Sequence, residues 1–62
     1  MLEQLPLLLI VDDDMTFRRV LERAMQRRGY EVMTAESVES AMTIANQHAP
    51  EYAVIDLKMH GA

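Results

Sequence analysis

Carboxylates that directly follow two short apolar runs are the residues of this 62-residue chain best placed to do chemistry. Three consecutive aspartates, residues 12–14, follow the apolar run 7–11, and Asp56 follows the run 52–55. Ionised carboxylates are costly to bring near apolar surroundings, and near each other, unless a cation or protons relieve them. If the two runs are neighbouring parallel strands, their ends place these acids in one pocket. The pattern therefore predicts a divalent-metal site.

The apolar patterning predicts the elements that would position these acids. The unbroken run 7–11 is typical of a strand covered on both faces, whereas residues 30–34 alternate imperfectly, as an edge strand does. We expect strands at about 7–11, 30–34 and 52–56, and helices at about 15–28 and 37–48.

The helix ends carry their own signals. Asp14 is a plausible N-cap of the first helix, with Gly29 just past its last turn, and Ser37 suits the start of the second. Within the first helix, apolar residues recur at the spacing of an amphipathic helix, namely Phe17, Val20, Leu21, Ala24 and Met25.

The order β-α-β-α-β with short links predicts an α/β fold with a parallel sheet and right-handed crossovers. The fully apolar first strand belongs in the centre and the alternating second strand at an edge, which gives the order 2-1-3. In open parallel sheets of this kind, of which flavodoxin-like proteins are an example, ligands bind beyond the carboxyl ends of the strands where the strand order reverses. The acids lie at that crevice.

Clustered oxygen donors suit Mg²⁺, which takes one or two carboxylates together with waters and phosphate oxygens. No cysteine and no paired histidine supports a zinc site. One carboxylate could act as a nucleophile toward a phosphoryl group and form an acyl phosphate. Only two glycines occur and none forms a phosphate cradle, which disfavours a nucleotide-binding enzyme.

Composition narrows the remaining classes. The net charge is −4, and the sequence pI of about 4.9 argues against direct nucleic-acid binding. Five of the six basic residues fall between residues 18 and 28, after the first acid cluster. The longest apolar run is too short to span a bilayer, and residues 1–4 lack the basic start of a secretory signal. We expect a small cytoplasmic domain without membrane association.

The residues at the strand ends resemble a known family. Residues 8–14 (Leu-Leu-Ile-Val-Asp-Asp-Asp), the Arg18-Arg19 pair and residues 52–59 (Tyr-Ala-Val-Ile-Asp-Leu-Lys-Met) are similar to the receiver domain of two-component response regulators. The resemblance extends from residue 7 to residue 61, and residues 56–61 look most like the redox-responsive, RegA-type branch.

This resemblance implies roles for the acids. Asp56 would accept the phosphoryl group. Asp13 and Asp56 would bind Mg²⁺ directly, Asp12 would bind it through water, and the backbone carbonyl of Lys58 would be a further ligand. The donor would be a phosphohistidine on a sensor histidine kinase or phosphotransfer protein. Receivers promote their own phosphorylation and dephosphorylation but are not conventional enzymes.

The chain also departs from the receiver pattern. A full receiver has five strands, a Ser or Thr after strand 4 and a Lys after strand 5, so residues 1–62 correspond to the amino-terminal half. The residues that report phosphorylation are absent from these 62, and we expect an impaired switch. His60 replaces the usual proline, a milder difference that affects loop stiffness.

Other interpretations remain open for the same residues. Asp12 and Asp14 could simply favour a helix N-terminus, and Asp56 could be a solvated residue at a strand end. The arginines of the first helix could be a solvated face or part of a kinase-docking surface. The second functional hypothesis is a non-catalytic interaction module that forms a homodimer or larger assembly through the exposed edge of the third strand.

Overall fold

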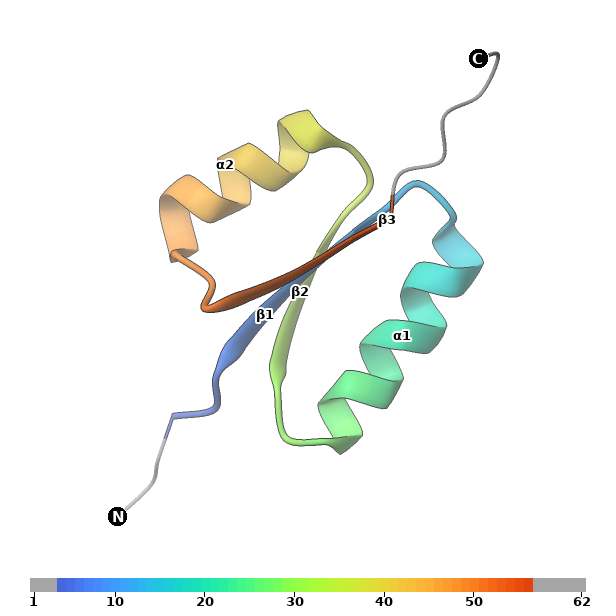
Figure 1. Ribbon diagram of the computed structural model, residues 1–62, viewed down its shortest axis with the longest axis vertical. Coiled ribbons are helices and arrows are strands. Elements are labelled where there is room, and N and C mark those ends of the chain that lie inside the picture. Colours follow the sequence, from blue (N-terminus) through green and yellow to red (C-terminus); the bar gives the residue numbers. More distant parts are fainter. Residues whose placement is uncertain (1–3, 57–62) are drawn as a thin grey trace.

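The computed structural model describes residues 4–56, which form a three-stranded parallel sheet with two helices (Figure 1). The elements in chain order are β1 (Leu7–Asp12), α1 (Met15–Arg27), β2 (Glu31–Ala35), α2 (Val38–His48) and β3 (Tyr52–Asp56). The sheet order is β2-β1-β3. The expected β-α-β-α-β fold, the order 2-1-3 and the edge position of the second strand are therefore confirmed.

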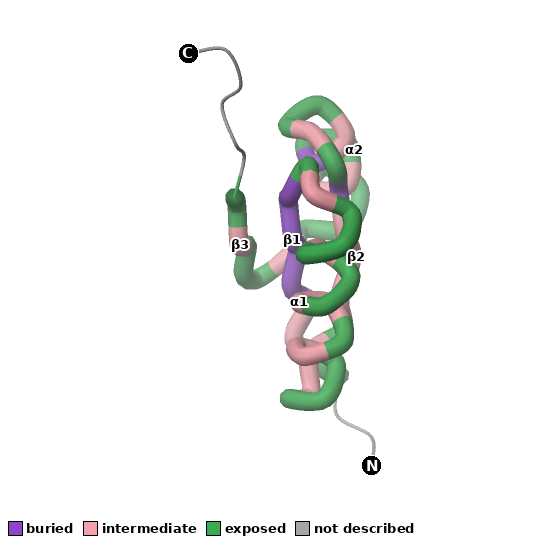
Figure 2. The backbone as a smooth tube through the Cα atoms, turned by 90° about the vertical axis from the view of Figure 1, so that its right-hand side faces the viewer, coloured by how far each residue is buried: buried purple, intermediate pink, exposed green. Residues whose placement is uncertain are grey.

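The sheet is the middle of three layers, with α1 and α2 on opposite faces. Leu9 and Val11 of β1 pack with Ala35 and Ala41 in a buried cluster on the α2 side. Because side chains alternate along a strand, Leu8, Ile10 and Asp12 belong to the α1 side. β1 carries most of the buried residues, and β3 is exposed along most of its length (Figure 2). An unbroken apolar sequence thus forms the one strand with neighbours on both sides.

Both helices begin at the residues that the sequence predicts. The Asp14 side chain accepts hydrogen bonds from the backbone N–H groups of Thr16 and Phe17. Ser37 makes a capping box with Ser40 at the start of α2. Gly29 follows the end of α1 with a φ of +95°, a conformation that glycine adopts without steric cost. The predicted capping residues are therefore found at both helix starts, and the predicted glycine is found after α1.

The apolar stripes of the helices are covered only in part. Val20 is 60% exposed and Met42 is 57% exposed, although both belong to stripes that a core would cover. The reason is that α1 and α2 both pack on β1 and β2, while neither helix packs on β3 in the described part of the chain. No helix among residues 4–56 is long and apolar enough to cross a membrane.

Candidate functional site

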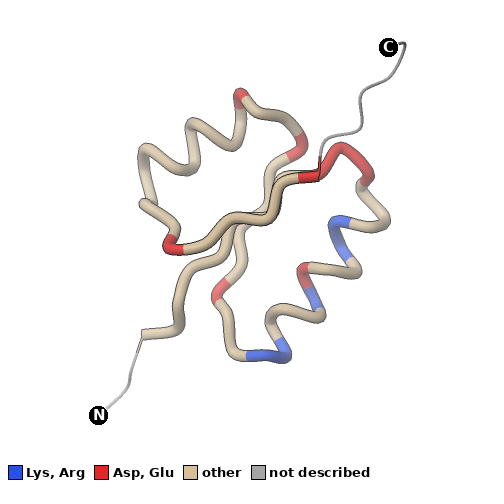
Figure 3. The backbone as a smooth tube through the Cα atoms, viewed as in Figure 1, with Lys and Arg blue, Asp and Glu red and all other residues tan. Residues whose placement is uncertain are grey.

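The strand order brings Asp12 and Asp56 together at the carboxyl ends of β1 and β3. The two residues are partners in the parallel register, as are Ile10 and Val54 two residues earlier. Residues in register share a face of the sheet, so both carboxylates belong to the α1 side. Figure 3 shows the acidic end of β3 beside the acidic turn that follows β1. The sequence-predicted meeting of the two strand ends is thus present in the structure.

Asp12 is enclosed by protein. Asp12 is 1% exposed, and its Oδ1 accepts a hydrogen bond from the backbone N–H of Asp14 at 2.8 Å. Its Oδ2 is buried and has no hydrogen-bond partner in the structure. A buried carboxylate oxygen without a donor has lost its water and gained nothing in return. An atom of this kind is suited to meet a cation or a cation-bound water.

The two following aspartates have different settings. Asp13 lies in the turn between β1 and α1 and is exposed. Asp14 is half-buried and caps α1 through its Oδ1, which lies 3.0 Å from the Thr16 nitrogen and 3.2 Å from the Phe17 nitrogen. The helix-cap interpretation therefore holds for Asp14. It does not hold for Asp12, whose carboxylate bonds the turn and not the helix.

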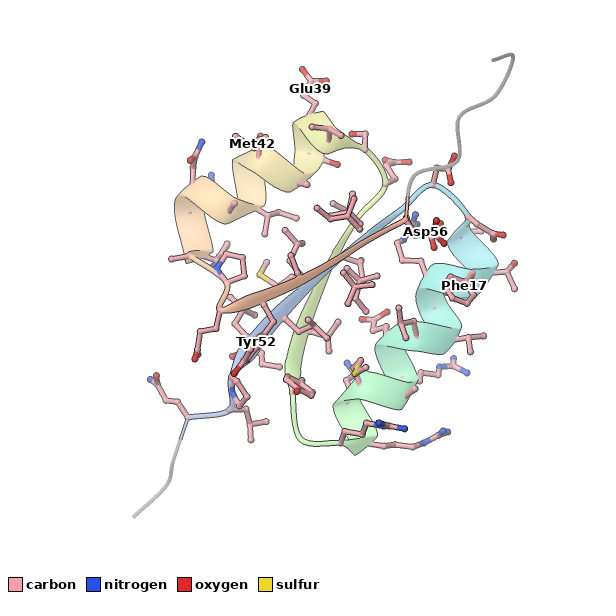
Figure 4. All side chains as sticks on the ribbon, in the orientation of Figure 1. Phe17, Glu39, Met42, Tyr52 and Asp56 are labelled. Atoms are coloured by element: carbon pink, nitrogen blue, oxygen red, sulfur yellow. The ribbon has the colours of Figure 1, made fainter. Side chains whose placement is uncertain are left out.

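Asp56 is the accessible member of the register pair. It is exposed at the last position of β3, at the opposite end of the strand from Tyr52 (Figure 4). An exposed carboxylate beside a buried one gives the site an open side, from which an incoming group can approach Asp56. Asp12 offers no such approach.

The structure does not gather the four predicted acids into one metal-holding group, and Asp14 is used as the cap of α1. Among residues 4–56, no group of three or more acidic, histidine or cysteine side chains is close enough to hold a metal ion. Mg²⁺ needs only one or two carboxylates because it keeps several waters. Asp12 and Asp56 could supply those carboxylates, and Asp13 is one residue away on an exposed turn. Lys58, the expected carbonyl ligand, lies outside the described residues.

Arg18 takes part in the site, which sequence reasoning missed. Its Nη1 donates to the backbone oxygen of Asp12 at 2.7 Å, and the residue is half-buried. The solvated-face interpretation suits Arg19 and Arg23, which are exposed, but not Arg18. The one available signal was position: Arg18 lies in the first turn of a helix that starts beside the strand end.

Comparisons with known proteins agree with this geometry. The sequence matches the response regulator receiver domain family over residues 8–62. The photosynthetic apparatus regulatory protein RegA of Rhodovulum sulfidophilum is 50% identical over 54 residues, which are 87% of this chain and 30% of that protein. The acid tolerance regulatory protein ActR of Sinorhizobium medicae is 52% identical over 52 residues, which are 84% of this chain and 27% of that protein.

A relative of lower sequence identity matches a stretch of the same length as ActR does. The probable transcriptional regulator ycf27 of Cyanophora paradoxa is 42% identical over 52 residues, which are 84% of this chain and 22% of that protein. The chain spans less than a third of the length of each of these three relatives. No solved structure matches it. With the family match over residues 8–62 and the parallel β2-β1-β3 sheet both in place, the chain belongs to the response regulator receiver domain family.

Proposed function

We propose that this chain is a phospho-accepting receiver unit of a two-component phosphorelay, with Asp56 as the acceptor. The observation that carries the proposal is the register pairing of Asp12 with Asp56 on one side of the sheet. It supplies an accessible carboxylate next to a buried one whose Oδ2 has no partner. As the family resemblance implies, Asp13 and Asp56 would bind Mg²⁺ directly, Asp12 would bind it through water, and the backbone carbonyl of Lys58 would be a further ligand. Because no group of three acids among residues 4–56 is arranged to hold a metal by itself, waters would supply the remaining ligands.

The chemistry is the formation of an acyl phosphate. A carboxylate oxygen of Asp56 attacks the phosphorus of the donor, the new O–P bond forms, and the bond to the leaving group breaks. With a phosphohistidine donor the leaving imidazole keeps the bond electrons and takes up a proton. When bound, Mg²⁺ neutralises charge on the phosphoryl oxygens. Asp12 is held in place by protein contacts, so its orientation need not change during the transfer.

The partner that fits this chemistry is a sensor histidine kinase or a phosphotransfer protein in the cytoplasm. The chain would serve as the substrate of that protein and assist the transfer, and it would not act as a conventional enzyme. RegA and ActR are each longer than this chain, and an output activity would belong to the parts of those proteins that this chain does not cover.

Intact-mass measurement after incubation with a small acyl-phosphate donor and Mg²⁺ tests the acceptor. We expect the mass gain of one phosphoryl group, its loss in Asp56→Asn, and its removal by hydroxylamine, which cleaves acyl phosphates. Glu51→Gln is the matched control, because it removes an exposed acid at the other end of β3. A gain that persists in Asp56→Asn, or no gain in the unaltered chain, would reject the proposal.

A second candidate function is self-association, and the exposure of β3 favours it. In the described residues β3 pairs only with β1, and Ile55 is 66% exposed. An apolar hollow on the α2 side borders the same strand; its lining includes Val38, Met42 and Ile55. An unpaired strand edge beside apolar surface is a template for pairing with another chain.

The backbone directions of the sheet show which groups that edge offers. Glu31 N–H donates to the Pro6 carbonyl, and Glu51 N–H donates to the Leu7 carbonyl, both at 3.0 Å. Odd-numbered residues of β1 therefore direct their backbone groups toward β3. Since Leu9 is in register with Ala53, the groups of Ala53 and Ile55 point away from β1.

A second copy of this chain fits that edge as an antiparallel strand centred on Val54. This register pairs Ala53 with Ile55 and sets Asp56 opposite Tyr52, so no carboxylate faces another. A parallel arrangement in register would place the two copies of Asp56 side by side, which is repulsive. Closed two-fold pairing is also the commonest symmetry of oligomers.

Proline substitution separates this edge from the rest of the sheet. Ala53→Pro removes an N–H that points outward, so the fold should survive while the weight-average mass from light scattering falls to that of a monomer. Ala53→Ser keeps the N–H and should associate as the unaltered chain does. A monomeric unaltered chain, or unchanged association of a folded Ala53→Pro protein, would contradict the proposed edge.

A further inference from the structure

Arg18 makes two contacts that together enclose the acidic turn at residues 12–14. Its guanidinium Nη1 donates to the backbone oxygen of Asp12 at 2.7 Å. Its own backbone N–H donates to the backbone oxygen of Asp14 at 2.9 Å. The first and last residues of the turn are therefore bound to one residue of α1.

The Asp12 carbonyl would otherwise have no strand partner. Within the β1–β2 ladder the last registered pair is Val11 with Ala35, where β2 ends. Asp12 lies one residue past that pair, and its backbone groups face the β2 side because even-numbered residues of β1 point there. Arg18 supplies the donor that β2 does not, which satisfies a group in an almost fully buried residue.

The bond also fixes the carboxylate of the same residue. With its carbonyl held by Arg18 and its Oδ1 held by the Asp14 N–H, Asp12 is anchored at both ends. Its partnerless Oδ2 is then the one side-chain oxygen left for a ligand. Arg18 also lines an open hollow together with Thr34, Glu36 and Ser40.

We propose that Arg18 is a positioning residue that clamps the turn and presets Asp12 for Mg²⁺. This inference rests on the Mg²⁺ site of the proposed function. A positioning role and a purely electrostatic role for Arg18 predict opposite changes in Mg²⁺ affinity when the arginine is removed. Removing a positive charge close to a cation site should tighten cation binding, whereas loosening the turn should weaken it. Weaker binding in spite of the lost charge therefore identifies the clamp.

Arg18→Met and Arg19→Met form a matched pair, because each removes one arginine and Arg19 is the exposed neighbour. We expect Mg²⁺ affinity in a calorimetric titration to fall about 10-fold in Arg18→Met, the lower end of the losses seen when groups that orient a metal ligand are removed. Arg19→Met should bind Mg²⁺ as the unaltered chain does or slightly more tightly. Arg18→Lys, which retains a charged donor, should recover part of the affinity.

Amide hydrogen exchange provides a readout that needs no metal. In metal-free Arg18→Met, exchange at the Asp14 N–H and the first turn of α1 should be about 10-fold faster, the effect of losing one hydrogen bond to a charged donor, while amides in the middle of β1 keep their protection. Faster exchange at every amide would show a general loss of stability and overturn the clamp. Unchanged exchange at Asp14, or Mg²⁺ affinity equal to that of Arg19→Met, would overturn it as well. If the unaltered chain binds no Mg²⁺, the proposed function fails and the exchange pattern alone decides on the clamp.

Discussion

At the scale of single residues, Asp12 and Asp56 differ in exposure, and the proposed function assigns them different roles. Asp12 is enclosed and held by the turn, and Asp56 is open to solvent in the neighbouring strand. In the proposed function, enclosure would fix the Asp12 carboxylate near the cation, and exposure would let a large donor approach Asp56. The setting of Asp12 has a cost, because its buried Oδ2 has no hydrogen-bond partner and its register partner is a second acid, Asp56. Stability without metal should therefore improve when the charge is removed.

Asp12→Asn should raise the stability of the metal-free protein by about 1 kcal/mol, because a neutral amide is cheaper to bury than a carboxylate. The amide oxygen can still accept the Asp14 N–H. For a domain of this size the melting temperature should rise by about 4–8 °C, measured by circular dichroism in the presence of a chelator. Asp56→Asn should shift it in the same direction by less, because Asp56 is exposed.

Glu51→Gln controls for net charge, since it removes one exposed acid at the far end of β3. Its melting temperature should stay within the error of the unaltered chain. A lower melting temperature in Asp12→Asn would mean that the ionised Asp12 side chain stabilises the fold, which would contradict the expected cost of its buried carboxylate.

The site was predictable to the extent that it follows from strand order. A fully apolar run and an alternating run were enough to place 7–11 in the centre, and that placement, together with the parallel register of β1 and β3, sets Asp12 beside Asp56. The separate settings of Asp12 and Asp13 depend on where β1 ends, which is a matter of one residue. The Arg18 bond depends on the path of a long side chain to a carbonyl six residues earlier in the sequence, and no periodicity encodes such a path.

At the scale of elements, the acidic turn and α1 act as one unit because Asp14 closes the turn and starts the helix. Three hydrogen bonds join β1, the turn and the first turn of α1. The Asp14 N–H donates to the Asp12 carboxylate, the Thr16 N–H donates to the Asp14 carboxylate, and the Arg18 side chain donates to the Asp12 carbonyl. Loss of the cap should therefore affect both helix stability and the turn. Apolar periodicity predicted α1 itself, but the exposure of Val20 was not predictable from it. That exposure depends on what covers the helix, and α1 does not reach β3.

Asp14→Ala should lower the free energy of unfolding by about 1 kcal/mol, the usual value of an N-cap. Asp14→Asn keeps an acceptor for the N–H groups of Thr16 and Phe17, and asparagine caps helices about as well as aspartate. Chemical denaturation followed by circular dichroism compares the three proteins. If alanine and asparagine lower stability equally, the charge of Asp14 matters and the cap does not.

At the scale of the whole molecule, a thin core means that a cost of about 1 kcal/mol at Asp12 is a noticeable share of the total stability. A chain of about 60 residues buries only about 60% of the surface that it exposes when unfolded. In the described residues the buried apolar set consists of six side chains, four of them on β1. A ligand that relieves the acids should therefore have a visible effect on the melting of the entire domain.

The unaltered chain and the Asp12→Asn variant should therefore change their order of stability when Mg²⁺ is added. Without metal the variant is the more stable protein. With Mg²⁺ in excess only the unaltered chain gains, by about 2.7 kcal/mol at a concentration 100 times the dissociation constant. The two melting temperatures should cross as Mg²⁺ is added at constant ionic strength, which removes simple screening from the comparison. Parallel curves would mean that Asp12 does not contribute to metal binding, because stabilisation by a ligand at this site must depend on the residue that the strand and the turn hold there.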